Sequence, residues 1–141
     1  FSQTPKLKEI VIPEGCSLTS RNFVNSGVEK VTLPSTTQFI PQECFLNCSN
    51  LKNIEIPDGV TRIGDMAFYG SGIDVLEIPQ SIRVLERWII GSPNSNGGYA
   101  MTKSNKIKVR GLNKEQAREW FENQVHTSSP AYHNLYLRKI I

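Results

Sequence analysis

The residues that metal or thiol chemistry would use are three cysteines and two histidines. Cys44 and Cys48 are four positions apart, whereas redox pairs follow Cys-x-x-Cys and structural zinc sites use four ligands in short-spaced pairs. With Cys16 the count is odd, so the cysteines cannot all pair within the chain. His126 and His133 have no Cys, Asp or Glu at ligand spacing. We therefore expect no metal, no cofactor and no disulfide framework, with both histidines at the surface.

Acidic residues, the other candidates for chemistry, are spread along the chain and form no pair. A nucleophile needs a base and an orienting partner, and glycoside hydrolysis needs a cleft that holds two acids apart. No Gly-x-Ser-x-Gly, His-Glu-x-x-His or Walker loop is present. The sequence therefore predicts that this segment is not an enzyme.

Basic residues gather in the last part of the chain: residues 101–141 hold eight Lys/Arg and three Asp/Glu, whereas residues 1–100 hold eight and ten. Such a segment attracts phosphates, yet the interleaved aromatics typical of single-strand binding are missing. We expect a solvated cap and no nucleic-acid partner. No apolar run approaches the roughly 20 residues that cross a bilayer, and no basic segment followed by an apolar core opens the chain, so neither a membrane span nor a signal peptide is expected in this segment.

The elements that hold these residues come from one repeated pattern. Four prolines each close a short segment in which apolar and polar residues alternate, and the prolines lie 21, 23 and 22 residues apart. A fixed period in this range is typical of a solenoid, in which each repeat contacts only its neighbours. The copies are LKEIVIP, VEKVTLP, LKNIEIP and IDVLEIP, which end at Pro13, Pro34, Pro57 and Pro79.

Each alternating segment is expected to be a short strand, one per repeat, in a parallel sheet. Successive side chains of a strand point to opposite faces, so the first and third residues of each trio would be buried and the middle one exposed. Proline ends each strand because it has no N–H to donate. The trios are Ile10-Val11-Ile12, Val31-Thr32-Leu33, Ile54-Glu55-Ile56 and Leu76-Glu77-Ile78. The second halves of the repeats supply the opposite wall and close on Asn22-Phe23, Cys44-Phe45, Ala67-Phe68 and Ile89-Ile90.

The copy that begins at Leu51, LKNIEIPDGVTRIGDMAF, resembles the BspA-like (Treponema pallidum type) leucine-rich repeat, in which proline follows the strand where ordinary leucine-rich repeats have asparagine. Ile63-Gly64 and Ala67-Phe68 match its pattern, and Cys48 stands at its core cysteine position. The resemblance thus implies that Cys44 and Cys48 are small buried hydrophobes. The resemblance covers about residues 1–90. It implies a leucine-rich-repeat solenoid, mainly β, in a secreted or cell-surface protein, often bacterial, that binds other macromolecules.

Phe1 stands at the spacing of a closing phenylalanine, because it precedes Leu7 by six residues, as Phe45 precedes Leu51. We infer that an earlier repeat precedes this segment in the intact protein. A start codon or a leader cleavage site directly before Phe1 would contradict this inference.

From Ile90 onward the period fails. The run GSPNSNGG indicates an exposed loop over residues 91–105, within an irregular last repeat that ends the repeat region (1–112). Such an insertion is either a binding edge or a relaxed terminal repeat. Residues 113–141 are expected to form a C-terminal α-helical cap. It would contain a helix over about 113–124, with Asn113 as N-cap and Gln116 completing a capping box, and a strand over about 134–140.

The outward residues of the strands would form two columns, and the sheet face of a solenoid is a common binding surface. We expect a non-enzymatic recognition module that binds a protein or glycan through this face. The alternative is a structural spacer or targeting arm of a larger surface protein whose activity lies elsewhere. The resemblance implies an extracellular or cell-surface location. Candidate binding residues are Glu9, Val11, Lys30, Thr32, Asn53, Glu55, Val75 and Glu77, continued by Lys106 and Lys108.

Overall fold

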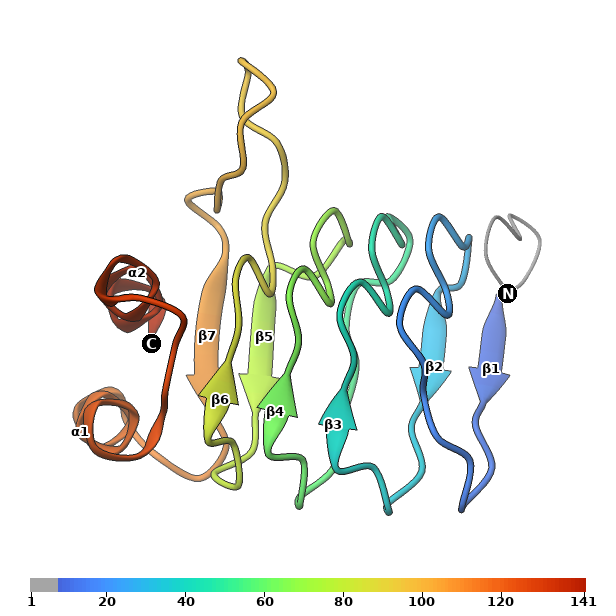
Figure 1. The fold of residues 1–141 in the computed structure, drawn as a ribbon, viewed down its shortest axis with the longest axis horizontal. Helices are drawn as coiled ribbons and strands as arrows, with labels where there is room; N and C mark the ends of the chain where they lie inside the picture. The colour runs from blue at the N-terminus through green and yellow to red at the C-terminus, as the bar shows by residue number, and fades with distance from the viewer. Residues whose placement is uncertain (1–7) are drawn as a thin grey trace.

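The computed structural model describes residues 8–141, in which a row of coils lies side by side and ends on two helices (Figure 1). Phe1 and Leu7, on which the prediction of an upstream repeat depends, lie outside the described residues. The elements in chain order are β1 (Glu9–Val11), β2 (Lys30–Thr32), β3 (Phe39–Ile40), β4 (Arg62–Ile63), β5 (Val75–Ile78), β6 (Val84–Leu85), β7 (Lys106–Val109), α1 (Lys114–Gln124) and α2 (Pro130–Lys139).

All pairs between these strands are parallel, and most paired residues are one repeat apart. The pairs at offsets of 21, 23 and 22 residues are Glu9 with Lys30, Phe39 with Arg62, and Arg62 with Val84. Val75 pairs with Lys106, an offset of 31 residues, because loop 91–105 is inserted between β5 and β7. The chain is therefore a repeat fold whose strand register continues past the insertion.

The prediction of one strand per repeat is wrong. Strands run along two lines: β1–β2 and β5–β7 come from the segments before the prolines, and β3–β4–β6 come from the second halves of the repeats. The second halves also alternate, since Arg62 is exposed and Ile63 is fully buried, and they therefore suit a strand as well. The expected strand at Ile54–Ile56 does not form, although both isoleucines are buried as predicted.

A third line of backbone hydrogen bonds joins the turns that close the repeats. The amides of Phe23, Phe45 and Phe68 each donate to a carbonyl of the next repeat at 2.8–2.9 Å. Each repeat is thus bonded to the next at up to three places, which satisfies backbone groups that a packed coil would otherwise leave unpaired. Near its start, each turn also holds a residue in the left-handed region, with φ between 49° and 59°, namely Arg21, Glu43, Met66 and Trp88. Four positions later in the first three turns, Asn25, Asn47 and Gly70 have positive φ as well.

A stack of phenylalanines fills the interior behind these turns. The ring centroids of Phe23 and Phe45 are 5.1 Å apart and those of Phe45 and Phe68 are 5.3 Å apart, with interplanar angles of 5° and 1°. All three side chains are at most 1% exposed. The predicted closing positions are therefore core positions, and they pack against the same position of the neighbouring repeat.

The first C-terminal helix begins as predicted. Helix α1 has Asn113 as its N-cap: Gln116 N donates to Asn113 Oδ1 at 2.9 Å, and Asn113 N donates to Gln116 Oε1 at 3.0 Å. Ala117 and Phe121 are its buried residues, which agrees with a single apolar stripe. Neither α1 nor any other helix within residues 8–141 is long and apolar enough to cross a bilayer.

The predicted strand at 134–140 is wrong, because these residues belong mostly to α2. Pro130 lies in the first turn, where its missing N–H costs nothing and its fixed φ suits a helix. Tyr132, Leu135 and Tyr136 then follow at helical spacing and pack against the core. Only the chain end is extended, where Ile140 forms a parallel bridge with Ile107 of β7.

Candidate functional site

The predicted binding residues lie on the outward face of β1, β2, β5 and β7 and of the unpaired segment 53–56, but in separate groups. The register sets Val11 beside Thr32, and Lys30 Nζ lies 3.7 Å from Glu9 Oε1. Asn53 and Glu55 are exposed yet belong to no strand. In the second strand pair the same register sets Val75 beside Lys106 and Glu77 beside Lys108.

Between β2 and residues 53–56 the face is open. A groove of about 400 Å³ lies here, lined by Lys30, Thr32, Asn53 and Glu55 and reaching Glu14 at its edge. Four of the eight predicted residues therefore meet at one place. We name this hollow the repeat groove.

The repeat groove has hydrogen-bonding walls. Lys30 N donates to Lys8 O and Thr32 O accepts from Ile12 N, both at 3.0 Å, so these residues bond toward β1. Because successive residues of a strand direct their N–H and C=O groups to opposite sides, those of Val31 and Leu33 face the groove. No strand pairing joins β2 to 53–56 in the described part of the chain. The groove thus offers a strand edge together with an ammonium, a carboxylate, a hydroxyl and an amide.

Glu14 is held at the rim of the repeat groove. Its carboxylate accepts the Ser35 amide at 2.9 Å and the Ser35 hydroxyl at 3.0 Å. The backbone hydrogen bond from Ser35 is the largest cause of the lowered pKa of Glu14, and the Ser35 hydroxyl adds to it. The rim therefore carries a fixed negative charge at neutral pH.

On the other side of residues 53–56, toward β5, the side chain of Arg110 bridges the neighbouring repeats. Its Nη2 donates to Ile56 O at 2.9 Å, its Nη1 to Asp58 Oδ1 at 2.8 Å and its Nε to Glu77 Oε1 at 3.0 Å. Glu77, which the sequence predicts as a binding residue, is therefore engaged within the protein. Arg110 stands 54 positions after Ile56, so no local pattern could have shown this contact.

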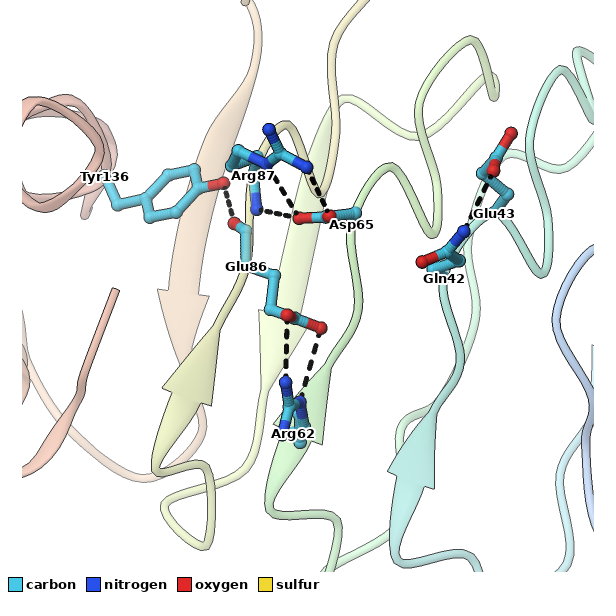
Figure 2. A network of polar contacts seen from close by, with 7 residues as sticks. All are labelled: Gln42, Glu43, Arg62, Asp65, Glu86, Arg87 and Tyr136. Atoms are coloured by element: carbon cyan, nitrogen blue, oxygen red, sulfur yellow. Dashed lines mark hydrogen bonds and ion pairs between the residues drawn. The ribbon is translucent and has the colours of Figure 1, made fainter. Parts of the chain in front are cut away.

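Polar pairs on the second strand line bind the repeats to one another and to the cap (Figure 2). Arg62 donates to both carboxylate oxygens of Glu86, at 3.3 and 2.9 Å, and Arg87 donates to both of Asp65, at 3.2 and 2.8 Å. The hydroxyl of Tyr136 donates to the backbone carbonyl of Glu86, which ties α2 to the repeats. Sequence reasoning missed the two arginine–carboxylate pairs, although their partners come from adjacent repeats, 24 and 22 residues apart.

The cysteines and histidines take different places. Cys44 and Cys48 are fully buried as predicted, and Cys48 Sγ donates to Phe23 O at 3.0 Å. His126 is exposed, whereas the ring of His133 is half-buried and lies 4.7 Å from that of Phe121, so the prediction of a surface histidine is wrong there. Within residues 8–141, no group of three or more His, Cys, Asp or Glu side chains could hold a metal ion.

Thiol labelling at about pH 8 is expected to modify Cys16 and to leave Cys44 and Cys48 unreacted in the folded protein. Burial raises the pKa of Cys44 from 9.0 to about 12, with a smaller contribution from Cys48, and burial raises the pKa of Cys48 to about 11. Only the thiolate reacts, and three pKa units leave about 1000-fold less of it at Cys44. Mass spectrometry after iodoacetamide treatment should show one added group, and all three cysteines should react after denaturation. A second group on the folded chain would contradict the structure.

Coils of nearly constant length, bonded to one another in parallel, define a repeat protein with a hollowed polar face. The sequence profile of the BspA type leucine rich repeat region matches residues 1–94 in six copies. The chain belongs to this family, as the copy at Leu51 predicts. The match ends within loop 91–105, before the cap. No curated protein matches the chain.

Proposed function

We propose that this chain is a non-enzymatic recognition module of a surface or secreted protein, and that it binds a protein or glycan through the outward face of its repeats. The row of coils is then a segment of a solenoid, which carries its ligand on a broad face shared by several repeats. The repeat groove is the observation that carries this proposal.

The groove supports binding because the side chains of Lys30, Thr32, Asn53 and Glu55 are exposed. Lys30 and Glu55 offer opposite charges across the hollow, and Asn53 and Thr32 offer an amide and a hydroxyl. Side chains of both signs together with a strand edge suit a polar partner that both donates and accepts hydrogen bonds. Protein backbones and sugar hydroxyls share this property. The pairing of Arg110 with Glu77 shifts the proposed contact toward the repeats that precede β5.

A charge exchange across the repeat groove tests the proposal. The double variant Lys30→Glu, Glu55→Lys keeps the net charge but reverses the pattern that a partner would meet. Glycan arrays and arrays of extracellular proteins would identify ligands of the unchanged protein, and the variant should bind them at least about tenfold more weakly, which corresponds to about 1.4 kcal/mol.

The matched control is Lys114→Glu, Glu119→Lys, which exchanges two exposed charges on α1. It should bind as the unchanged protein does. Both variants alter exposed side chains only, so both should melt within a few degrees of the unchanged protein. Equal binding by the groove variant and the control would exclude the groove as the contact.

The second candidate function is a structural spacer or targeting arm. The continuous phenylalanine stack and the lines of backbone hydrogen bonds favour it, because they make adjacent repeats a stiff unit. Failure of the unchanged protein to bind any array ligand would support this alternative.

A further inference from the structure

Three aromatic side chains from separate parts of the chain meet at the base of loop 91–105, away from the repeat groove. Trp88 comes from the turn after β6, Tyr99 from the loop and Tyr132 from the first turn of α2. The Trp88 and Tyr99 ring centroids are 6.0 Å apart with planes 27° from parallel, and those of Trp88 and Tyr132 are 5.5 Å apart and nearly perpendicular. We name these three residues the aromatic platform.

The aromatic platform is the outer layer of a deeper cluster. Tyr69, 3% exposed, lies 5.5 Å from Tyr99, and Tyr136, fully buried, lies 6.4 Å from Tyr132. These two buried tyrosines account for the packing of the loop base and the cap. Tyr99, by contrast, keeps 58% of its surface exposed, and Trp88 is half-buried. The outer rings thus present apolar area that the fold itself does not use.

The loop that carries Tyr99 is built to hold a fixed shape, and it projects beyond the row of coils (Figure 1). The Oδ1 of Asn94 accepts the amides of Asn96 and Gly98, both at 2.9 Å, and Ser92 N donates to Ala100 O at 3.0 Å. A partner therefore meets rings that are already in place, and little conformational entropy is lost on binding.

Gly91 fixes where this loop leaves the repeats. Its φ is +135°, and a Cβ there would lie 2.2 Å from Ala100 O and 3.1 Å from the Tyr69 ring. Only glycine therefore permits the close approach of the two loop ends that sets Tyr99 over Trp88.

The charged side chains of the turn that carries Trp88 are paired within the protein. Arg87 is bonded to Asp65 through its backbone amide at 2.9 Å and through its guanidinium, and Glu86 is bonded to Arg62. This arrangement disfavours a strongly charged partner, because such a partner would gain no unpaired counter-charge from these residues. Asn94, Ser95 and Asn96 of the same loop are exposed and carry amide and hydroxyl groups.

From these observations we infer that the aromatic platform binds a neutral glycan, whose sugar rings stack on Tyr99 and Trp88 by their C–H faces while their hydroxyls bond to polar groups of the loop. An exposed tyrosine ring beside a half-buried tryptophan ring, polar side chains on the same loop and paired charges in the Trp88 turn match the chemistry of an uncharged sugar chain. This inference rests on different residues from the repeat groove, so either can fail without the other.

Trp88 itself supplies the readout. The chain has two tryptophans, so Trp120→Phe leaves Trp88 as the only one. Titration of this single-tryptophan protein with cellohexaose, mannohexaose and xylohexaose up to about 10 mM, ten times a dissociation constant of about 1 mM, should quench or shift the Trp88 fluorescence with at least one sugar. Tyr99→Ala should weaken that binding about tenfold, because stacking on an exposed ring is lost. Tyr99→Phe, which keeps the ring, should bind within about twofold.

Three results would overturn the inference. The first is no fluorescence change with any of the three hexasaccharides, and the second is equal binding by Tyr99→Ala and the unchanged protein. The third is a response to decaproline in place of the sugars, since extended proline segments also dock on aromatic surfaces. If a sugar binds the unchanged protein and Tyr99→Ala equally well but no longer binds the Lys30→Glu, Glu55→Lys variant, this inference is overturned and the proposed groove stands.

Discussion

Replacing Phe68 by alanine is expected to lower the free energy of unfolding by about 3–5 kcal/mol, the usual cost of removing a buried phenyl group. Phe68 is fully buried and stacks on Phe45 at 5.3 Å, and its amide donates to Ile89 O at 2.9 Å. The substitution leaves a cavity between two repeats that share this stack. The total free energy of unfolding of a domain is only about 5–15 kcal/mol, so the variant should be partly unfolded near physiological temperature.

Urea unfolding followed by tryptophan fluorescence measures this loss. Phe39→Ala is the matched control, because Phe39 lies in β3 and is 53% exposed. Its free energy of unfolding should change by no more than about 0.5 kcal/mol. If Phe68→Ala unfolds within the same margin, the phenylalanine stack is not the core of the repeats.

Gly64→Ala is expected to cost about 3 kcal/mol, at the upper end of the effects of added volume in a packed interior. A Cβ at Gly64 would lie 2.5 Å from Gln42 N and 2.9 Å from Pro41 C. These atoms are backbone and cannot rotate away, so β3 and β4 would have to separate. The same change would strain the hydrogen bond from Gly64 N to Ile40 O, now 2.8 Å.

Gly59→Ala separates steric contact from backbone strain. Gly59 has a φ of +102°, yet a Cβ there would meet no atom within 4 Å. This control should therefore cost only the 1–2 kcal/mol or so of an unfavourable backbone conformation. Thermal unfolding of the two variants side by side measures the difference, and a larger loss at Gly59 would contradict the close approach of the repeats at Gly64.

Much of the architecture could be predicted because it depends on local patterns. The proline spacing predicts the offsets at which strands pair, and alternation predicts that Ile54 and Ile56 are buried. The cap helix α1 was predictable from Asn113 and Gln116, whose side chains satisfy the free backbone groups of its first turn. Alternation misled at 134–140, because Leu135 and Leu137 suit a strand while the stripe that begins at Tyr132 suits the helix that forms.

The candidate sites were harder to predict. The residues of the repeat groove lie on the predicted face, but the sequence did not show where along that face the groove opens. Its position depends on the end of the parallel strand pairing at β2 and on the hydrogen bonds of Arg110 to Ile56 and Glu77. The aromatic platform was not predicted at all. Its residues come from three different elements, and the outward columns of the strands carry no aromatic residue that would have indicated them. Only the position of α2 beside the last repeat brings Tyr132 to Trp88, 44 positions earlier.

Taken alone, the amino-acid order determined the period of the coils, the side chains that enter them and the helix that begins the cap, because each follows from contacts within one repeat or with the same position in the next. The tertiary structure alone decided which backbone edges stay unpaired and which rings gather on the surface. Those outcomes depend on how closely neighbouring coils approach each other. They also depend on contacts between distant residues, such as the hydrogen bond of Arg110 to Ile56, 54 positions earlier. Both are set by the packing of the whole chain.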